Sequence, residues 1–98
     1  MKAEALMRSG GNPSAIVNEL RTIRGADPIT NVSEQDVIDE RGRELYNEFW
    51  RRSDLIRFGQ FTSPWAYKTV TGDESRNLFP IPATALITNP NLVQNSGY

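Results

Sequence analysis

MKAEALMRSGGNPSAIVNELRTIRG, residues 1–25, contains two helix-forming segments on either side of the pair Gly10-Gly11. Asn12 and Pro13 indicate the start of the second segment, because asparagine caps helix N-termini and proline fits the first helical position. Apolar residues then recur at helical spacing: Ile16, Val17, Leu20 and Ile23. The stretch predicts two short antiparallel helices, and with them an all-α fold.

Such a helical hairpin is similar to one unit of a tetratricopeptide-type array. One hairpin cannot enclose its own core, and arrays of this kind need several units. The first helix also has no preceding residue that could cap it, although its apolar side chains need a partner surface. We therefore expect residues 1–98 to form a single C-terminal segment of a larger protein.

From Ser33 to about Arg52 the sequence predicts one long helix. Asp36, three residues after Ser33, completes a capping-box pattern, in which two side chains bond to backbone amides at the helix start. The apolar residues after this cap keep helical spacing. With one further turn, the helical part is expected to cover residues 1–61, and an irregular loop without periodicity covers residues 62–76, here named the aromatic loop.

Residues 77–98, NLFPIPATALITNPNLVQNSGY, form a tail without a charged side chain, although 23% of the whole chain is charged. Its three prolines exclude a long helix or a central strand, and it is too apolar for a free disordered tail. We expect the tail to dock on a protein surface, with asparagine amides satisfying its turns. The apolar residues expected to be buried are Leu78, Phe79, Ile81, Leu86, Ile87, Leu92 and Val93.

The composition argues against several classes of protein. The length of 98 residues allows one domain at most. The net charge of −1 leaves no basic excess to attract nucleic acid. The chain has neither histidine nor cysteine, which removes the commonest general base, nucleophile and transition-metal ligands. We therefore expect no enzymatic activity, no cofactor, no metal and no nucleic-acid partner.

Three blocks of the sequence resemble the SusD/RagB family, whose members are surface glycan-binding lipoproteins of Bacteroidetes-type bacteria. These blocks are AEALMRSGGNPSAIVNELRTIRG (3–25), ERGRELYNEFWRRSDLIRFGQF (40–61) and LFPIPATALITNPNLVQNSGY (78–98), in the family's order. Two positions depart from the family pattern. Phe49 stands where glycine usually follows glutamate, which implies different local packing, and Ser96 stands where proline usually precedes the final Gly-Tyr.

The resemblance implies a non-catalytic protein that captures an oligosaccharide or polysaccharide at the bacterial outer membrane. It implies delivery of that glycan to a SusC-like TonB-dependent transporter. The full-length protein would be a surface-exposed lipoprotein whose anchor signal lies outside residues 1–98. Details of the second and third blocks favour the starch-utilisation branch. In this interpretation the present segment is mainly scaffold.

Trp65 and Tyr67 are the candidate glycan-binding residues of the aromatic loop. Sugars present apolar C–H faces that stack on aromatic rings. From the sequence alone we favour the other interpretation, in which both rings anchor the loop to the body of the protein. In the resembling family the glycan contacts generally come from other parts of the chain, so the resemblance itself assigns neither residue.

Acidic residues raise a second possibility. Glu40, Glu44 and Glu48 recur every four residues, and a pair of carboxylates can catalyse glycoside hydrolysis. A helix face beside arginines is more often an ion-paired surface. Asp73 and Glu74 could offer oxygen atoms to calcium, but they lack the spacing of an EF-hand loop, so we expect a plain turn.

Asp54 and Arg57, three residues apart, are expected to form a buried pair that fixes the helix end to the tail. Two other functions remain as alternatives to glycan capture. The first is a small helical protein-interaction module of tetratricopeptide type. The second, less favoured, is a glycoside hydrolase fragment that uses Glu40, Glu44 or Glu48.

Overall fold

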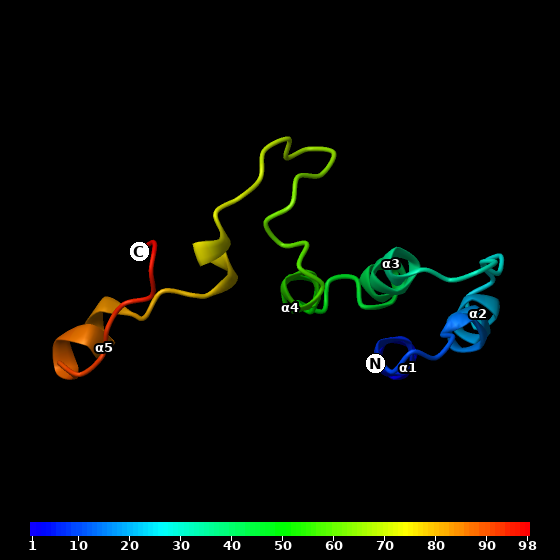
Figure 1. Ribbon diagram of the computed structural model, residues 1–98, viewed down its shortest axis with the longest axis horizontal. Coiled ribbons are helices and arrows are strands. Elements are labelled where there is room, and N and C mark those ends of the chain that lie inside the picture. The colour runs from blue at the N-terminus through cyan, green and yellow to red at the C-terminus, as the bar shows by residue number, and fades with distance from the viewer. The chain divides into compact units, whose positions relative to one another are not determined.

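The computed structural model describes residues 1–98, and all of its regular elements are helices (Figure 1). The predicted all-α class is therefore confirmed. Residues Met1–Arg51 and Arg52–Tyr98 form two compact units, which we describe separately as unit 1 and unit 2. None of the helices has the length and apolar character needed to cross a membrane. The elements are α1 (Lys2–Arg8), α2 (Ser14–Ile23), α3 (Glu34–Glu44), α4 (Arg51–Arg57), the 3-10 helix η1 (Glu74–Asn77) and α5 (Ala83–Thr88).

In unit 1, α1 and α2 form the predicted helical hairpin, and α3 also packs against α1 (Figure 1). Gly10 in the turn between α1 and α2 has a φ of 84°, a left-handed conformation that glycine adopts without strain. The Asn12 Oδ1 atom accepts a hydrogen bond from the Ser14 N–H at 2.9 Å, and Pro13 has helical backbone angles. The predicted start signal of α2 is therefore confirmed.

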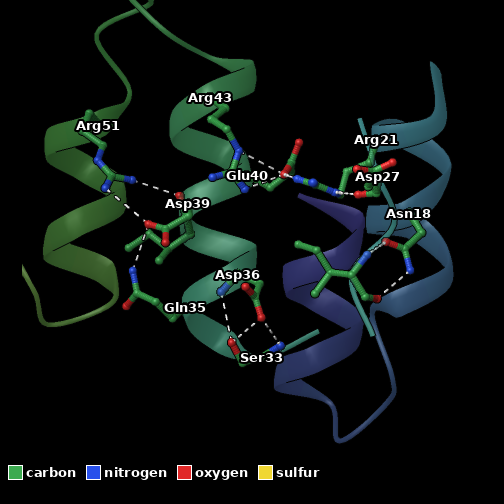
Figure 2. Close-up of polar contacts among 12 residues, drawn as sticks. Asn18, Arg21, Asp27, Ser33, Gln35, Asp36, Asp39, Glu40, Arg43 and Arg51 are labelled. Atoms are coloured by element: carbon green, nitrogen blue, oxygen red, sulfur yellow. Dashed lines mark hydrogen bonds and ion pairs between the residues drawn. The ribbon is translucent and has the colours of Figure 1, made fainter. Parts of the chain in front are cut away.

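The core of unit 1 is small. Ser33 begins α3 with the predicted capping box, in which its Oγ accepts from the Asp36 N–H at 3.2 Å while Asp36 Oδ2 accepts from the Ser33 N–H at 2.8 Å (Figure 2). The buried hydrophobic residues of the unit are Val17 of α2 and Val37 and Ile38 of α3. A core of this size agrees with the expectation that one hairpin does not enclose a core of its own.

The prediction of a single long helix from Ser33 to about Arg52 is wrong. The helix α3 ends at Glu44, and α4 begins seven residues later. In the intervening turn Asn47 and Phe49 have φ values of 64° and 62°, left-handed conformations that a continuous right-handed helix excludes. The side chain of Phe49 is 94% exposed, so no burial favours continuing the helix through this position.

In unit 2 the tail folds back on itself through neutral amides. The side chain of Gln94 accepts a hydrogen bond from the Ile81 N–H at 2.8 Å and donates one to the Ile81 carbonyl at 2.9 Å. Asn95 Nδ2 donates to the Phe79 carbonyl at 2.7 Å. These bonds bring the residues on either side of α5 together. The bonds of Asn95, and of Asn89 to the Asn91 N–H at 3.1 Å, agree with the expected role of asparagine amides, whereas the role of Gln94 was not predicted.

The predicted burial of all seven apolar tail residues is not found within the described chain. Only Ile81 and Leu86 are half-buried. The reason is that the tail closes on its own backbone through polar bonds, which leaves few apolar neighbours for its side chains. Docking of the tail on another surface therefore stays a prediction. The exposed apolar residues are Leu78, Phe79, Ile87, Leu92 and Val93.

Candidate functional site

The aromatic loop places Trp65 and Tyr67 on one tight turn. The Trp65 N–H donates to the Lys68 carbonyl at 2.7 Å, and the Lys68 N–H donates to the Trp65 carbonyl at 2.9 Å. This reciprocal pair is the hydrogen-bond pattern of a two-residue hairpin turn, with Ala66 and Tyr67 at its tip. The two predicted residues are therefore presented together at the end of the loop.

The two rings contact each other and remain open to solvent. Their centroids lie 5.6 Å apart at an interplanar angle of 81°, the edge-to-face arrangement that aromatic pairs favour. Trp65 is 60% exposed and Tyr67 is 90% exposed. Within the described chain, neither ring is therefore buried as anchoring of the loop would require. Glycan binding by the two rings stays a prediction.

Lys68 and Gly72 both bond to Thr62, at the start of the aromatic loop. Lys68 Nζ donates to the Thr62 carbonyl at 3.1 Å, and the Gly72 N–H donates to the same carbonyl at 2.6 Å. A β-carbon at Gly72 would lie 2.9 Å from Lys68 Nζ, so the lysine occupies the space that glycine leaves open. Sequence reasoning missed Lys68, because a side chain that bonds to a backbone carbonyl leaves no pattern of paired residue types.

Glu40 is held by arginines from two helices. Its Oε2 accepts from Arg21 Nη1 of α2 at 2.7 Å and from Arg43 Nη2 of α3 at 2.6 Å (Figure 2). Burial alone would raise the pKa of Glu40, but the hydrogen bonds from Arg43 and Arg21 hold that pKa below its ordinary value. A carboxylate kept ionised in this way is a poor proton donor, so the arrangement is that of a structural ion pair.

The other two carboxylates of the predicted series also lack a catalytic arrangement. Glu44 accepts from Arg24 Nε at 3.0 Å and from Arg24 Nη2 at 2.5 Å, and these bonds lower the pKa of Glu44. The prediction that Glu48 shares one helical face with Glu40 and Glu44 is wrong, because Glu48 lies in the turn after the end of α3. The ion-paired surface expected from the sequence is confirmed for Glu40 and Glu44.

Two further acidic residues of the sequence analysis have local roles. Asp73 Oδ1 accepts from the Ser75 N–H at 2.8 Å and caps η1, which confirms the expected plain turn. Asp54 Oδ1 accepts from Arg57 Nη2 at 2.7 Å, and the Asp54 side chain is 1% exposed. The predicted pair is thus formed and is buried at its acidic end. Its attachment to the tail stays a prediction.

The helical hairpin and the three matching blocks define the class of protein. The chain belongs to the SusD family, whose family model matches residues 1–98. It is 40% identical over 106 residues to the starch-binding protein SusD of Bacteroides thetaiotaomicron. That match covers 99% of this chain and 19% of the relative, so the chain spans about a fifth of the relative's length. The family resemblance seen in the sequence is therefore confirmed.

Proposed function

We propose that this chain is part of a longer SusD-type protein that captures glycan without cleaving it, and that residues 1–98 serve mainly as scaffold. Family membership and the likeness to a starch-binding relative support this proposal. Starch is accordingly the favoured glycan. The longer protein, here named the full-length protein, would be an outer-membrane surface lipoprotein that delivers its ligand to a SusC-like TonB-dependent transporter.

The scaffold role is supported by an apolar cavity in unit 1. The cavity has a volume of about 570 Å³ and opens beside α1, α2 and α3. A hairpin of tetratricopeptide type needs neighbouring units to bury such a surface. We therefore propose that another helix of the full-length protein fills the cavity. Its apolar lining residues include Ile16, Val17, Leu20, Val37, Leu45 and Trp50.

Within this chain, we propose that Trp65 and Tyr67 contact the glycan. A pyranose ring buries its apolar face against an indole or phenol ring, and the Tyr67 hydroxyl can donate to or accept from a sugar hydroxyl. The observation that carries this assignment is the exposure of both rings on a turn that holds them edge to face. A neutral sugar brings no charge of its own that would have to be desolvated on binding there.

The same apolar cavity favours one alternative, a small helical module that binds a peptide of a partner protein between its helices. In that case the cavity would take an amphipathic helix from another chain. The glycoside hydrolase alternative has no such support, because Glu40 and Glu44 are both bonded to arginines.

Native electrophoresis of the full-length protein through gels that contain amylopectin tests the proposal, with dextran gels as the reference. We expect amylopectin to retard the wild type, and we expect Tyr67→Ala and Trp65→Ala each to weaken the affinity about fivefold. Tyr46→Ala is the matched control, since Tyr46 is 84% exposed but lies outside the aromatic loop.

Absence of retardation on amylopectin and on other soluble glycans would contradict glycan capture and favour the peptide-binding alternative. Retardation that is equal in the wild type, Tyr67→Ala and Trp65→Ala would contradict only the assignment of the glycan contact to the aromatic loop.

A further inference from the structure

Arg52, the second residue of α4, contacts both ends of the aromatic loop. Its Nη2 donates to the carbonyl of Arg76 at 2.8 Å and to that of Asn77 at 3.2 Å, at the C-terminal end of the loop. Its guanidinium lies 5.0 Å from the ring centroid of Phe61, which directly precedes the loop, and 3.9 Å from that of Phe79, which follows it. One side chain therefore joins chain segments that are far apart in sequence.

Arginine is chemically suited to this double contact. Its planar guanidinium donates hydrogen bonds from the edge, and its faces stack on aromatic rings. A lysine at position 52 would keep the positive charge but would lose the planar group that serves both partners at once. The contacts of Arg52 thus depend on its shape as well as on its charge.

Two sets of contacts hold the ends of the aromatic loop together, and we name each set a closure. The contacts of Arg52 form the outer closure. The inner closure is the Thr62 carbonyl, which accepts from Lys68 Nζ and from the Gly72 N–H. Holding the ends of a loop together reduces the number of conformations open to the residues between them. A ligand that needs Trp65 and Tyr67 in one arrangement then spends less binding free energy on ordering them.

We infer that Arg52 is a positioning residue, which closes the aromatic loop and so presents Trp65 and Tyr67 as one preformed surface for a neutral glycan. This inference rests on the proposed function in one respect, the glycan contact of the two rings. Arg52 itself acts through the loop and does not touch the sugar.

Limited trypsin digestion of the full-length protein, well below its melting temperature, tests the closure without any glycan. The quantity measured is the rate of cleavage after Lys68, divided by the rate after Arg24, which lies in unit 1. We expect this ratio to rise about tenfold in Arg52→Gln, because cleavage follows the population of the open loop. Arg52→Lys should give a smaller rise.

Arg51→Gln is the matched control. It removes the same charge from the adjacent residue of α4, whose Nη1 donates to the Ile38 carbonyl at 2.9 Å and not to the loop. The ratio should stay at its wild-type value in this variant. Phe79→Ser is a second test, because Phe79 is 70% exposed and contributes the ring closest to Arg52. An unchanged ratio in both Arg52→Gln and Phe79→Ser would overturn the inference.

The amylopectin gel then tests whether closure affects binding. Arg52→Gln should lower the affinity about fivefold at an unchanged melting temperature, and Arg52→Lys should restore part of the loss. If the loop opens in Arg52→Gln but the affinity stays unchanged, the positioning role is overturned. If Trp65→Ala is also without effect, the assigned glycan contact has failed, whereas the trypsin ratio still reports on the closure.

Discussion

Phe49 combines an unfavourable backbone conformation with an exposed side chain. Its φ of 62° lies in the left-handed region, where a β-carbon costs about 1–2 kcal/mol. Its ring is 94% exposed, so burial does not offset that strain. The departure from the family's glycine was expected to change local packing. The structure adds that a residue with a β-carbon here adopts a left-handed conformation.

We therefore predict that Phe49→Gly stabilises the protein. The free energy of unfolding should rise by about 0.5–1 kcal/mol, because the relieved strain exceeds the added entropy of glycine in the unfolded chain. Urea unfolding of the full-length protein measures the change. Phe49→Ala is the control, since it removes the ring but keeps the β-carbon. An equal gain in both variants would show that the ring, and not the backbone, is responsible.

Individual contacts could be predicted where they are local in sequence. The Ser33–Asp36 cap was predictable, because both partners lie within one helical turn. The contacts of Arg52 and Lys68 were not, because their acceptors are backbone carbonyls that only the folded loop brings within reach. The turn at Tyr67 was also missed, since it contains none of the Asn-Gly or Gly-Gly pairs that indicate a two-residue hairpin.

At the scale of elements, polar contacts join α2 to α3 and to the connection between these two helices. Arg21 of α2 binds Glu40 of α3, and this pair is the most enclosed of the ion pairs between them. The connection is held by the Asn18 amide, which accepts from the Ile29 N–H at 2.8 Å and donates to the Ile29 carbonyl at 3.0 Å (Figure 2). Specific polar partners therefore supplement a small apolar core.

Glu40→Gln should destabilise the full-length protein by about 1–2 kcal/mol at neutral pH, since charged hydrogen bonds to Arg21 and Arg43 are lost. The folded-state pKa of Glu40 lies below its ordinary value of 4.5, so its contribution is complete above that value. The contribution is lost as the pH falls through the folded-state pKa. The difference in unfolding free energy between variant and wild type should therefore shrink as the pH falls from neutral through the folded-state pKa of Glu40.

Urea unfolding at several pH values measures this difference. Glu19→Gln, on an exposed position of α2, is the control and should have little effect at any pH. If Glu40→Gln lowers the free energy of unfolding as much at acid pH as at neutral pH, the shape of Glu40, and not its charge, stabilises the helices.

Element type was predictable here, but helix length was not. The residues between Glu44 and Arg51 include good helix formers and contain neither glycine nor proline. The one local indication that the helix would end was Asn47, because asparagine tolerates the left-handed conformation found at helix ends. The exposed side chains of Tyr46 and Phe49 show the reason, because a helical stripe is stabilised only where a partner surface buries it.

At the scale of the whole molecule, the described chain leaves much apolar surface uncovered. Unit 1 has an open apolar cavity, and unit 2 exposes most of the apolar residues of its tail. We predict that the isolated 98-residue chain is poorly folded or self-associated. The reason is that the conformational entropy lost on folding costs more free energy than the burial of such a small core gains.

Sedimentation and calorimetry of the isolated chain test this prediction, with the full-length protein as the reference. The expected result is a broad transition, a species larger than a monomer, or both. A sharp, cooperative melt from a monomer would contradict it and would show that residues 1–98 form an independent domain.

The ion pairs between α2 and α3 in unit 1 and the amide bonds of the tail in unit 2 differ in how they respond to ions in solution. Glu40 and Glu44 bind through full charges, whereas Gln94, Asn95 and the Tyr98 hydroxyl bind through neutral groups. Dissolved salt shortens the reach of charge–charge attraction, from about 8 Å at physiological ionic strength to about 3 Å in molar salt. Concentrated brine would therefore weaken the more exposed Arg24–Glu44 pair of unit 1 more than the enclosed Arg21–Glu40 pair, and the folded-back tail would keep its bonds.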